Sequence, residues 1–284
     1  MSIGIGVNAW VWTSPFDREA VRYIGTAVKM GFDAFTMPIE EPELIDIAAV
    51  KAAVDEHPIR LNVSGAYGPG RDLASTEPGH RKACLAYIHD MLKICQQLGI
   101  RIIGGPTYSQ VGKRRKLDDD ARRREWDLAV AGLKEAGRMA ADHGVTLALE
   151  PLNRFETDLV NTAAQVKRMV AEIDLPSVKI HLDTFHMHIE EQSIYDAIIL
   201  AGSDLVYFDA SESDRGTPGS AQVDWEGVAR ALKEIGYQGD CVIESFTPAC
   251  EAIADAACIW RPLATSQDAL ADDGGRFLRQ LLQR

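Results

Sequence analysis

One pattern recurs along the chain: a helix-like segment closes on glycine and runs directly into an apolar, strand-like segment. It occurs at Met30-Gly31-Phe32, Leu98-Gly99-Ile100, His143-Gly144-Val145 and Ile235-Gly236-Tyr237. Glycine is favoured just after a helix because that position often requires a positive φ angle. The repeat therefore predicts a chain in which helices alternate with strands.

Between the helix-like segments we count eight strand candidates, at residues 3–8, 33–39, 59–64, 101–106, 146–150, 178–183, 205–209 and 241–245. Eight strands alternating with helices over about 250 residues match the (β/α)₈ or TIM barrel. A doubly wound sheet fits less well, because no Gly-x-Gly-x-x-Gly motif opens the first helix. No low-complexity linker divides the chain, so we predict a single TIM-barrel domain spanning residues 1–284.

Local signals also predict where the first helix begins. Ser14 is a suitable N-cap, Pro15 suits the first helical position, and Ala20, Ile24 and Ala27 form one apolar stripe before the glycine stop. We therefore expect this helix to start at Pro15.

Four acidic residues each end an apolar strand candidate in the second half of the chain: Glu150, Asp183, Asp209 and Glu244. Side chains alternate between the two faces of a strand, and the bulkier apolar face should meet the helices. The acids then point into the barrel mouth, where barrel enzymes keep their chemistry. Burying several unpaired carboxylates together is costly without a cation, so the pattern predicts a metal site.

Charge and composition indicate which classes of binding partner are disfavoured. A formal net charge of −12 on 284 residues disfavours nucleic acid and anionic lipid and favours a small neutral substrate. No long apolar run and no basic leader is present, which favours a cytoplasmic protein without a membrane span. Five widely spaced cysteines without a Cys-x-x-Cys pair favour buried, reduced thiols.

Four longer motifs, in order, resemble those of one known family. They are Leu-Glu-Pro-Leu-Asn-Arg-Phe-Glu-Thr at 149–157 onward to Asn161, His-Leu-Asp-Thr-Phe-His-Met at 181–187, Ser-Glu-Ser-Asp-Arg-Gly-Thr-Pro-Gly at 211–219 and Ile-Glu-Ser-Phe at 243–246. The family is that of the ketose 3-epimerases (D-tagatose, D-allulose and L-ribulose 3-epimerases), which belong to the xylose-isomerase-like barrels. The resemblance covers essentially the whole chain.

The resemblance implies one divalent metal ion, manganese before magnesium or cobalt, and no organic cofactor. Glu150, Asp183, Asp209 and Glu244 would hold the ion. Glu150 and Glu244 would also exchange the C3 proton of a ketose through a cis-enediolate, one on each face of the sugar. The metal would serve as Lewis acid for the developing charge.

The same resemblance implies a substrate-binding group. Glu156, His186 and Arg215 would hold the O1 to O3 end of the sugar, and an arginine beside four acids also offsets their charge. Ser64 and Phe246 are expected in the pocket wall. Tyr108, which follows the fourth strand candidate, is a further pocket candidate because an aromatic ring suits the C–H face of a sugar.

One position departs from the family pattern. The chain reads Phe-Asp-Ala-Ser-Glu at 208–212, whereas the family motif is Phe-His-x-x-Glu. Asp209 can still act as a ligand and would shift the preference towards harder ions. It also adds negative charge to the site. His181, one layer deeper in the barrel, is expected to make a structural hydrogen bond.

The sequence thus favours a metal-dependent epimerase of a free ketose, since no glycine-rich phosphate cradle is found. One alternative is a sugar isomerase or related keto-sugar enzyme on the same barrel. Another is a catalytically impaired sugar-binding homologue, because of Asp209. A metal-dependent nuclease is disfavoured by the charge and the shortage of histidines. We expect a homodimer or homotetramer.

Overall fold

The computed structural model describes residues 3–282, and within them eight parallel strands close into a barrel. The strands follow one another around the barrel in chain order, and the last pairs with the first. They are β1 (Gly4–Asn8), β2 (Ala34–Ile39), β3 (Arg60–Gly65), β4 (Ile102–Gly105), β5 (Thr146–Leu149), β6 (Val178–Asp183), β7 (Leu205–Asp209) and β8 (Asp240–Ile243). The predicted (β/α)₈ barrel is confirmed.

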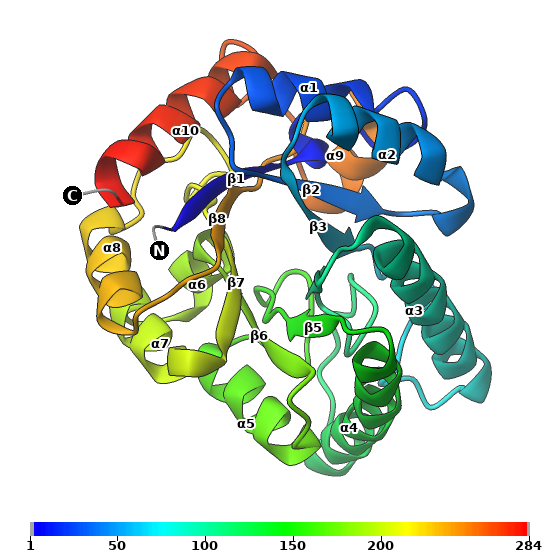
Figure 1. Ribbon diagram of the computed structural model, residues 1–284. Coiled ribbons are helices and arrows are strands. Elements are labelled where there is room, and N and C mark those ends of the chain that lie inside the picture. Colours follow the sequence, from blue (N-terminus) through cyan, green and yellow to red (C-terminus); the bar gives the residue numbers. More distant parts are fainter. Residues whose placement is uncertain (1–2, 283–284) are drawn as a thin grey trace.

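An outer ring of helices surrounds the strands (Figure 1). It consists of α1 (Arg22–Lys29), α2 (Ile47–Glu56), α3 (Pro78–Leu98), α4 (Asp119–Asp142), α5 (Ala163–Ile173), α7 (Ile194–Ala201), α8 (Trp225–Glu234) and α10 (Gln267–Leu282). Two shorter helices, α6 (Thr184–Glu190) and α9 (Glu251–Ala257), follow β6 and β8. Three 3₁₀ turns complete the description: η1 (Ala9–Val11), η2 (Pro42–Leu44) and η3 (Gly202–Asp204).

The glycine stops have the predicted backbone conformation. Gly31, Gly99, Gly144 and Gly236 have φ angles of 79°, 70°, 68° and 67°, all in the left-handed region. Each follows a helix and precedes a strand, so the repeat found in the sequence is the structural repeat of the barrel.

The predicted start of the first helix is wrong. α1 begins at Arg22 and has no side-chain cap. The hydroxyl of Ser14 instead donates to Glu40 Oε1 at 2.9 Å, and the Phe16 N–H donates to the other oxygen of Glu40. A long-range carboxylate therefore takes the hydroxyl that could have capped a helix.

The alternation of side chains along the strands is also confirmed. Ala148, Tyr207 and Val242 form a small cluster inside the barrel. Leu149 and Ile243, from the opposite faces, belong to the large core between strands and helices. Glu150 and Glu244 continue the inward series one residue beyond β5 and β8, which places both at the barrel mouth.

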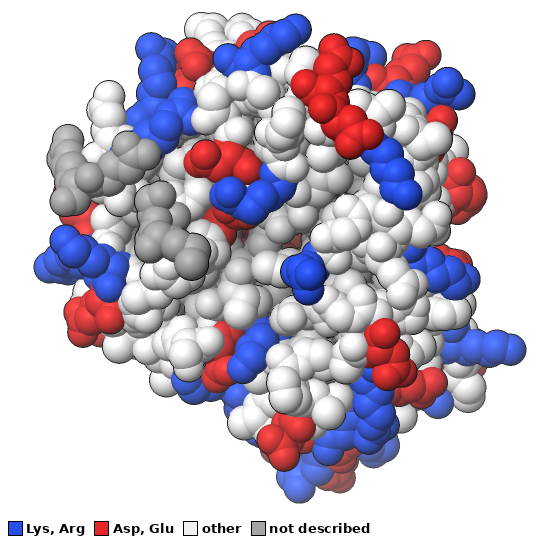
Figure 2. All heavy atoms as spheres, viewed as in Figure 1, with Lys and Arg blue, Asp and Glu red and all other residues white. Residues whose placement is uncertain are grey.

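On the face seen in Figure 2, acidic and basic side chains are mixed around the periphery. Among residues 3–282, no helix is long and apolar enough to cross a membrane. All five cysteines are free thiols, and Cys84, Cys95 and Cys241 are buried. The expectation of burial is wrong for Cys258, which is exposed, and Cys250 is half-buried.

Candidate active site

The four predicted acids are all buried at the end of the barrel where the strands finish. Asp183 and Asp209 are the last residues of β6 and β7 and are fully buried, while Glu150 and Glu244 are each 6% exposed. Asp183 is also the N-cap of α6, because its Oδ1 accepts the Phe185 N–H at 2.8 Å. Strand ends and one helix start therefore fix these carboxylates.

Arg215 lies between two of the acids. Its Nη1 donates to Asp183 Oδ2 at 2.6 Å, to Glu244 Oε2 at 3.0 Å and to Ser211 Oγ at 2.8 Å. The guanidinium also lies over the Phe185 ring, with 4.1 Å between Cζ and the ring centroid. Although burial opposes its charge, Asp183 and Glu244 raise the pKa of Arg215. It therefore remains a cation that offsets two carboxylates.

The loop that carries Arg215 is shaped by a buried carboxylate. Glu212 accepts hydrogen bonds from backbone N–H groups of its own loop and from the Trp225 indole. Burial opposes ionisation of Glu212, but these donors outweigh it and lower the pKa of its carboxyl. The backbone at Arg215 has a φ of 63°, and the Ser245 hydroxyl donates to the Arg215 carbonyl at 2.6 Å. The loop thus holds Arg215 in an uncommon conformation.

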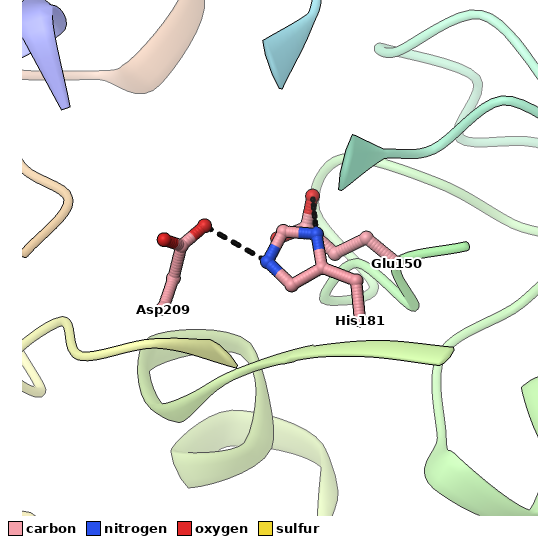
Figure 3. Close-up of side chains that lie close together, drawn as sticks. All are labelled: Glu150, His181 and Asp209. Atoms are coloured by element: carbon pink, nitrogen blue, oxygen red, sulfur yellow. Dashed lines mark hydrogen bonds and ion pairs between the residues drawn. The ribbon is translucent and has the colours of Figure 1, made fainter. Parts of the chain in front are cut away.

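His181 connects the other two acids (Figure 3). Its Nε2 lies 2.8 Å from Asp209 Oδ2, and its Nδ1 lies 3.6 Å from Glu150 Oε2. The predicted structural hydrogen bond of His181 is confirmed, and its acceptor is Asp209. Burial lowers the pKa of His181 to about 3, which favours the neutral imidazole.

His186 faces the acids from α6. Its Nε2 lies 3.6 Å from Glu150 Oε1 and 3.7 Å from Asp183 Oδ2. Its Nδ1 accepts the Asn153 backbone N–H at 3.1 Å, and the Asn153 amide also donates to Glu156 Oε1 at 2.8 Å. Asn153 therefore positions both His186 and Glu156.

A cavity of about 870 Å³, partly open to solvent, lies over this cluster. Its polar lining includes Glu150, Glu244 and most of the predicted substrate-binding residues, namely Ser64, Glu156, His186 and Arg215. Its apolar lining includes Trp10, Val111, Leu152, Phe246, Ile253 and Ala257. A cavity with convergent polar groups on one side and apolar walls on the other suits a small polar molecule with a carbon skeleton.

Tyr108 is not among the residues that line the cavity. It is fully buried, and its hydroxyl donates to the Val160 carbonyl at 3.1 Å. The pocket role expected for Tyr108 is therefore not supported by its position. Tyr108 does follow a strand, as expected, but its ring packs against the loop after β5 and does not face the cavity.

Asn8 was missed by the sequence reasoning. Its amide nitrogen lies 3.2 Å from both Ser64 Oγ and Glu244 Oε1, and the residue is fully buried. Asn8 ends β1 as the acids end their strands, so a polar residue closing an apolar strand was the available signal. Asn153 lies inside the recognised motif at 149–161 but was not assigned a role.

Burial and crowding raise the proton affinity of Glu150, Asp209 and Glu244. Burial, followed by the charges of Glu244, Asp183 and Asp209, raises the pKa of Glu150. Burial and Asp209 likewise raise the pKa of Glu244, while Arg215 lowers it. Burial and Asp183 raise the pKa of Asp209. Paired carboxylates with raised pKa values suit proton transfer or cation binding.

The donor atoms fit a divalent cation. Glu150 belongs to two groups of donors within 4.8 Å of one another, one with His181 and Asp209 and one with Asp183 and His186. Among the described residues, Glu150 Oε1, His181 Nδ1 and Asp209 Oδ1 are buried atoms without a hydrogen-bond partner. Carboxylate oxygens and imidazole nitrogens are the donors that manganese and similar ions accept.

Comparison with known proteins places these features in a family. The profile of the family described as "Xylose isomerase-like TIM barrel" matches residues 24–281. The chain is 32% identical over 268 residues to D-psicose 3-epimerase of Ruminiclostridium cellulolyticum, covering 93% of this chain and 90% of that protein. It is 31% identical over 281 residues to ketose 3-epimerase of Arthrobacter globiformis, covering 98% and 96%.

Solved structures agree. The D-allulose 3-epimerase from Methylomonas sp. superposes with a TM-score of 0.94 at 30% identity, covering 99% of this chain and 98% of that one. The same enzyme in complex with D-allulose gives a TM-score of 0.93 at 29% identity, covering 98% and 97%.

Proposed function

The chain belongs to the xylose isomerase-like TIM barrel family and, within it, to the ketose 3-epimerases, and we propose that it inverts C3 of a free ketose with the help of one divalent cation. As an isomerase acting on carbohydrates, it needs two proton-transfer groups at one carbon. The supporting observation is that Glu150 and Glu244, which carry raised pKa values, both line one cavity beside Arg215 and His186.

Glu150 and Glu244 are the proposed acid and base. They follow β5 and β8, which lie apart in the barrel order, and this separation suits approach to a sugar from two sides. One carboxylate takes the C3 proton and the other, protonated, returns a proton to the opposite face of the cis-enediolate. Burial raises the pKa of both carboxyls, which favours holding a proton on one member of the pair, as the return step requires.

The cation would be held by Glu150, Asp183 and Glu244, and by the hydrogen-bonded pair of Asp209 and His181. Manganese is our first choice because the donors are mainly carboxylates, with magnesium and cobalt as alternatives. When bound, it would act as a Lewis acid that offsets negative charge developing on the substrate oxygens.

Arg215, His186 and Glu156 are the proposed binding groups for the oxygens at the reacting end. All three line the cavity, and the polar and apolar sides are suited to a sugar's hydroxyls and carbon skeleton. A free ketose is preferred to a phosphorylated one, because three glutamates line the cavity and its one arginine is already engaged by Asp183 and Glu244.

The test is hydrogen exchange in deuterium oxide. The manganese-loaded protein is incubated with ketohexoses and ketopentoses, and deuterium at C3 is read by NMR. Glu150→Gln and Glu244→Gln should each abolish the exchange, whereas Glu135→Gln, an exposed position on α4, should retain it. Exchange at C1 and C2 but not at C3 would indicate an isomerase. Ketose binding without exchange would indicate a sugar-binding homologue, and then Asp209→His should be assayed for gained activity.

A further inference from the structure

Two histidines flank Glu150, and they present different nitrogen atoms to it. The Nδ1 of His186 accepts the backbone N–H of Asn153, and its Nε2 lies 3.3 Å from Nη2 of Arg215, which can only donate. That Nε2 is the atom that faces Glu150 and Asp183. Both ring nitrogens of His186 therefore already have hydrogen-bonding partners within the protein.

His181 differs, because only its Nε2 has a hydrogen-bond partner. Its Nε2 lies at hydrogen-bonding distance, 2.8 Å, from Asp209 Oδ2, and a cation in the site would offset the neighbouring negative charge and keep Asp209 ionised, so that this carboxylate can only accept. With Asp209 ionised, the proton of His181 is on Nε2 and the lone pair is on Nδ1. This Nδ1 is buried, has no hydrogen-bond partner and faces Glu150 Oε2 at 3.6 Å (Figure 3).

Two acceptors that face each other in a buried site repel unless positive charge lies between them. A proton on Nδ1 would supply that charge but would form no hydrogen bond with Glu150, because 3.6 Å exceeds hydrogen-bonding distance. A divalent cation can bind both atoms directly, because two coordination bonds of about 2.1 Å can span separations up to about 4.2 Å.

The neighbouring strand leaves room at this nitrogen. Gly104 on β4 lies beside the imidazole, and a β-carbon there would sit 3.1 Å from His181 Nδ1 and 3.3 Å from Tyr207 Cδ1. A side chain at position 104 would therefore crowd the lone pair. The site combines the unpaired Nδ1 of His181, the Oε2 of Glu150 that faces it and a glycine beside the imidazole, and the second oxygen of Glu150, Oε1, also has no hydrogen-bond partner.

We propose that His181 binds the active-site cation through Nδ1, together with Glu150, and that Asp209 holds the imidazole from its other side. Asp209 is then a positioning residue that accepts the Nε2–H. A carboxylate behind a metal-bound histidine is a common arrangement, because it fixes the tautomer and raises the basicity of the ring. This inference rests on the cation site of the proposed function, not on the reaction.

Pulsed electron paramagnetic resonance of the protein loaded with Mn²⁺ tests the proposal. Coupling of the manganese electron spin to an imidazole nitrogen is expected, and its pattern should change when histidine is labelled with ¹⁵N. His186→Gln should retain the coupling. This arm requires no change at His181, so it is informative even if variants at 181 fail to fold.

Two further variants separate ligand from positioning residue. His181→Gln, which keeps an N–H for Asp209, should lose the nitrogen coupling and weaken Mn²⁺ binding at least about tenfold. Asp209→Asn should keep the coupling and weaken binding about 10- to 100-fold. Thermal melting of both variants reports whether they are folded.

The proposal is overturned if Mn²⁺ does not bind, if bound Mn²⁺ shows no histidine nitrogen coupling, or if the coupling is lost in His186→Gln. These readouts do not depend on turnover. Nitrogen coupling without C3 exchange would remove the epimerase function and leave the ligand assignment standing, and C3 exchange without nitrogen coupling would do the reverse.

Discussion

At the scale of single residues, Arg215 determines how the acids of the site are arranged. Its Nη1 donates to Asp183, Glu244 and Ser211 at once. The Phe185 ring, which packs against the guanidinium, fixes the plane of that group. A lysine is a compact charge that cannot reproduce this planar geometry.

We therefore expect Arg215→Lys to lower kcat/KM for ketose epimerisation at least about tenfold, since one hydrogen bond to a charged group is worth about 1.5–3 kcal/mol. The measurement is steady-state kinetics with manganese present. Arg261→Lys is the matched control, because Arg261 is exposed and lies 3.7 Å from Asp214. Equal kcat/KM for Arg215→Lys and the wild type would contradict the role given to Arg215.

Whether a residue's place at the site could be predicted from the sequence depended on whether its position is set by its own strand or by distant segments. Glu150, Glu244, His186, Arg215 and Ser64 were expected at the site and do line the cavity. Asn8 was missed, since nothing local shows that its amide meets the end of β8. Tyr108 was misplaced, because the direction of its ring depends on packing against the segment near Val160.

At the scale of elements, the barrel is built from repeated helix, glycine and strand units. Gly144 links α4 to β5, which carries Glu150 at its end, and it has a φ of 68° with open space where a β-carbon would lie. A side chain at position 144 would meet no neighbouring atom, so any destabilisation would come from the left-handed backbone conformation alone.

Gly144→Ala should therefore destabilise the protein by about 1–2 kcal/mol, the cost of a left-handed conformation for an L-residue. Gly79→Ala is the control: it lies in the first turn of α3, has no left-handed φ, and also has open space at the β-carbon. That change should be neutral or mildly stabilising. Urea unfolding of both variants measures the difference, and equal effects would refute the argument from φ.

The loop between β7 and α8 depends on the charge of Glu212. Its carboxyl has a lowered pKa in the folded protein, so it stabilises the fold above the ordinary glutamate pKa of about 4.3. That contribution is lost as the pH falls through the lowered, folded-state pKa.

Glu212→Gln should reduce the free energy of unfolding at pH 7 by about 2 kcal/mol or more, because buried donors lose a charged acceptor. The difference from the wild type should shrink as the pH falls below about 4. Urea unfolding between pH 7 and pH 3 measures this difference, with the exposed Glu135→Gln as control. A difference that stays constant with pH would exclude ionised Glu212 as the cause.

At the scale of the whole molecule, closure of the barrel brings the acids together and buries them, and ionising buried carboxylates costs free energy. Glu150, Asp209 and Glu244 have raised pKa values, so the folded protein without a cation keeps protons that the unfolded chain loses above about pH 4. Their burial therefore reduces stability as the pH rises towards neutrality, and a cation would restore it.

Mn²⁺ should raise the melting temperature, and a chelator should reverse the rise. At a free ion concentration of 100 times Kd the stabilisation is about 2.7 kcal/mol. The rise should be larger at pH 7.5 than at pH 5.5, because fewer protons compete for the carboxylates. Glu150→Gln should show a smaller rise than the wild type. Identical melting curves with manganese and with chelator at both pH values would contradict the metal site.

Assembly of the molecule into a homodimer or homotetramer stays a prediction. Phe155 and Trp260 are large apolar side chains that are 63% and 71% exposed, and contact between subunits could cover them. Analytical ultracentrifugation measures the state directly.

The sequence by itself determined the (β/α)₈ repeat and the phase of the four acids, because helix stops, strand alternation and the barrel's direction are set by local backbone chemistry. The tertiary structure alone decided how those acids are paired: Arg215 joins Asp183 and Glu244, while His181 lies between Asp209 and Glu150. These pairings depend on distances across a closed barrel, and no spacing along the chain encodes them.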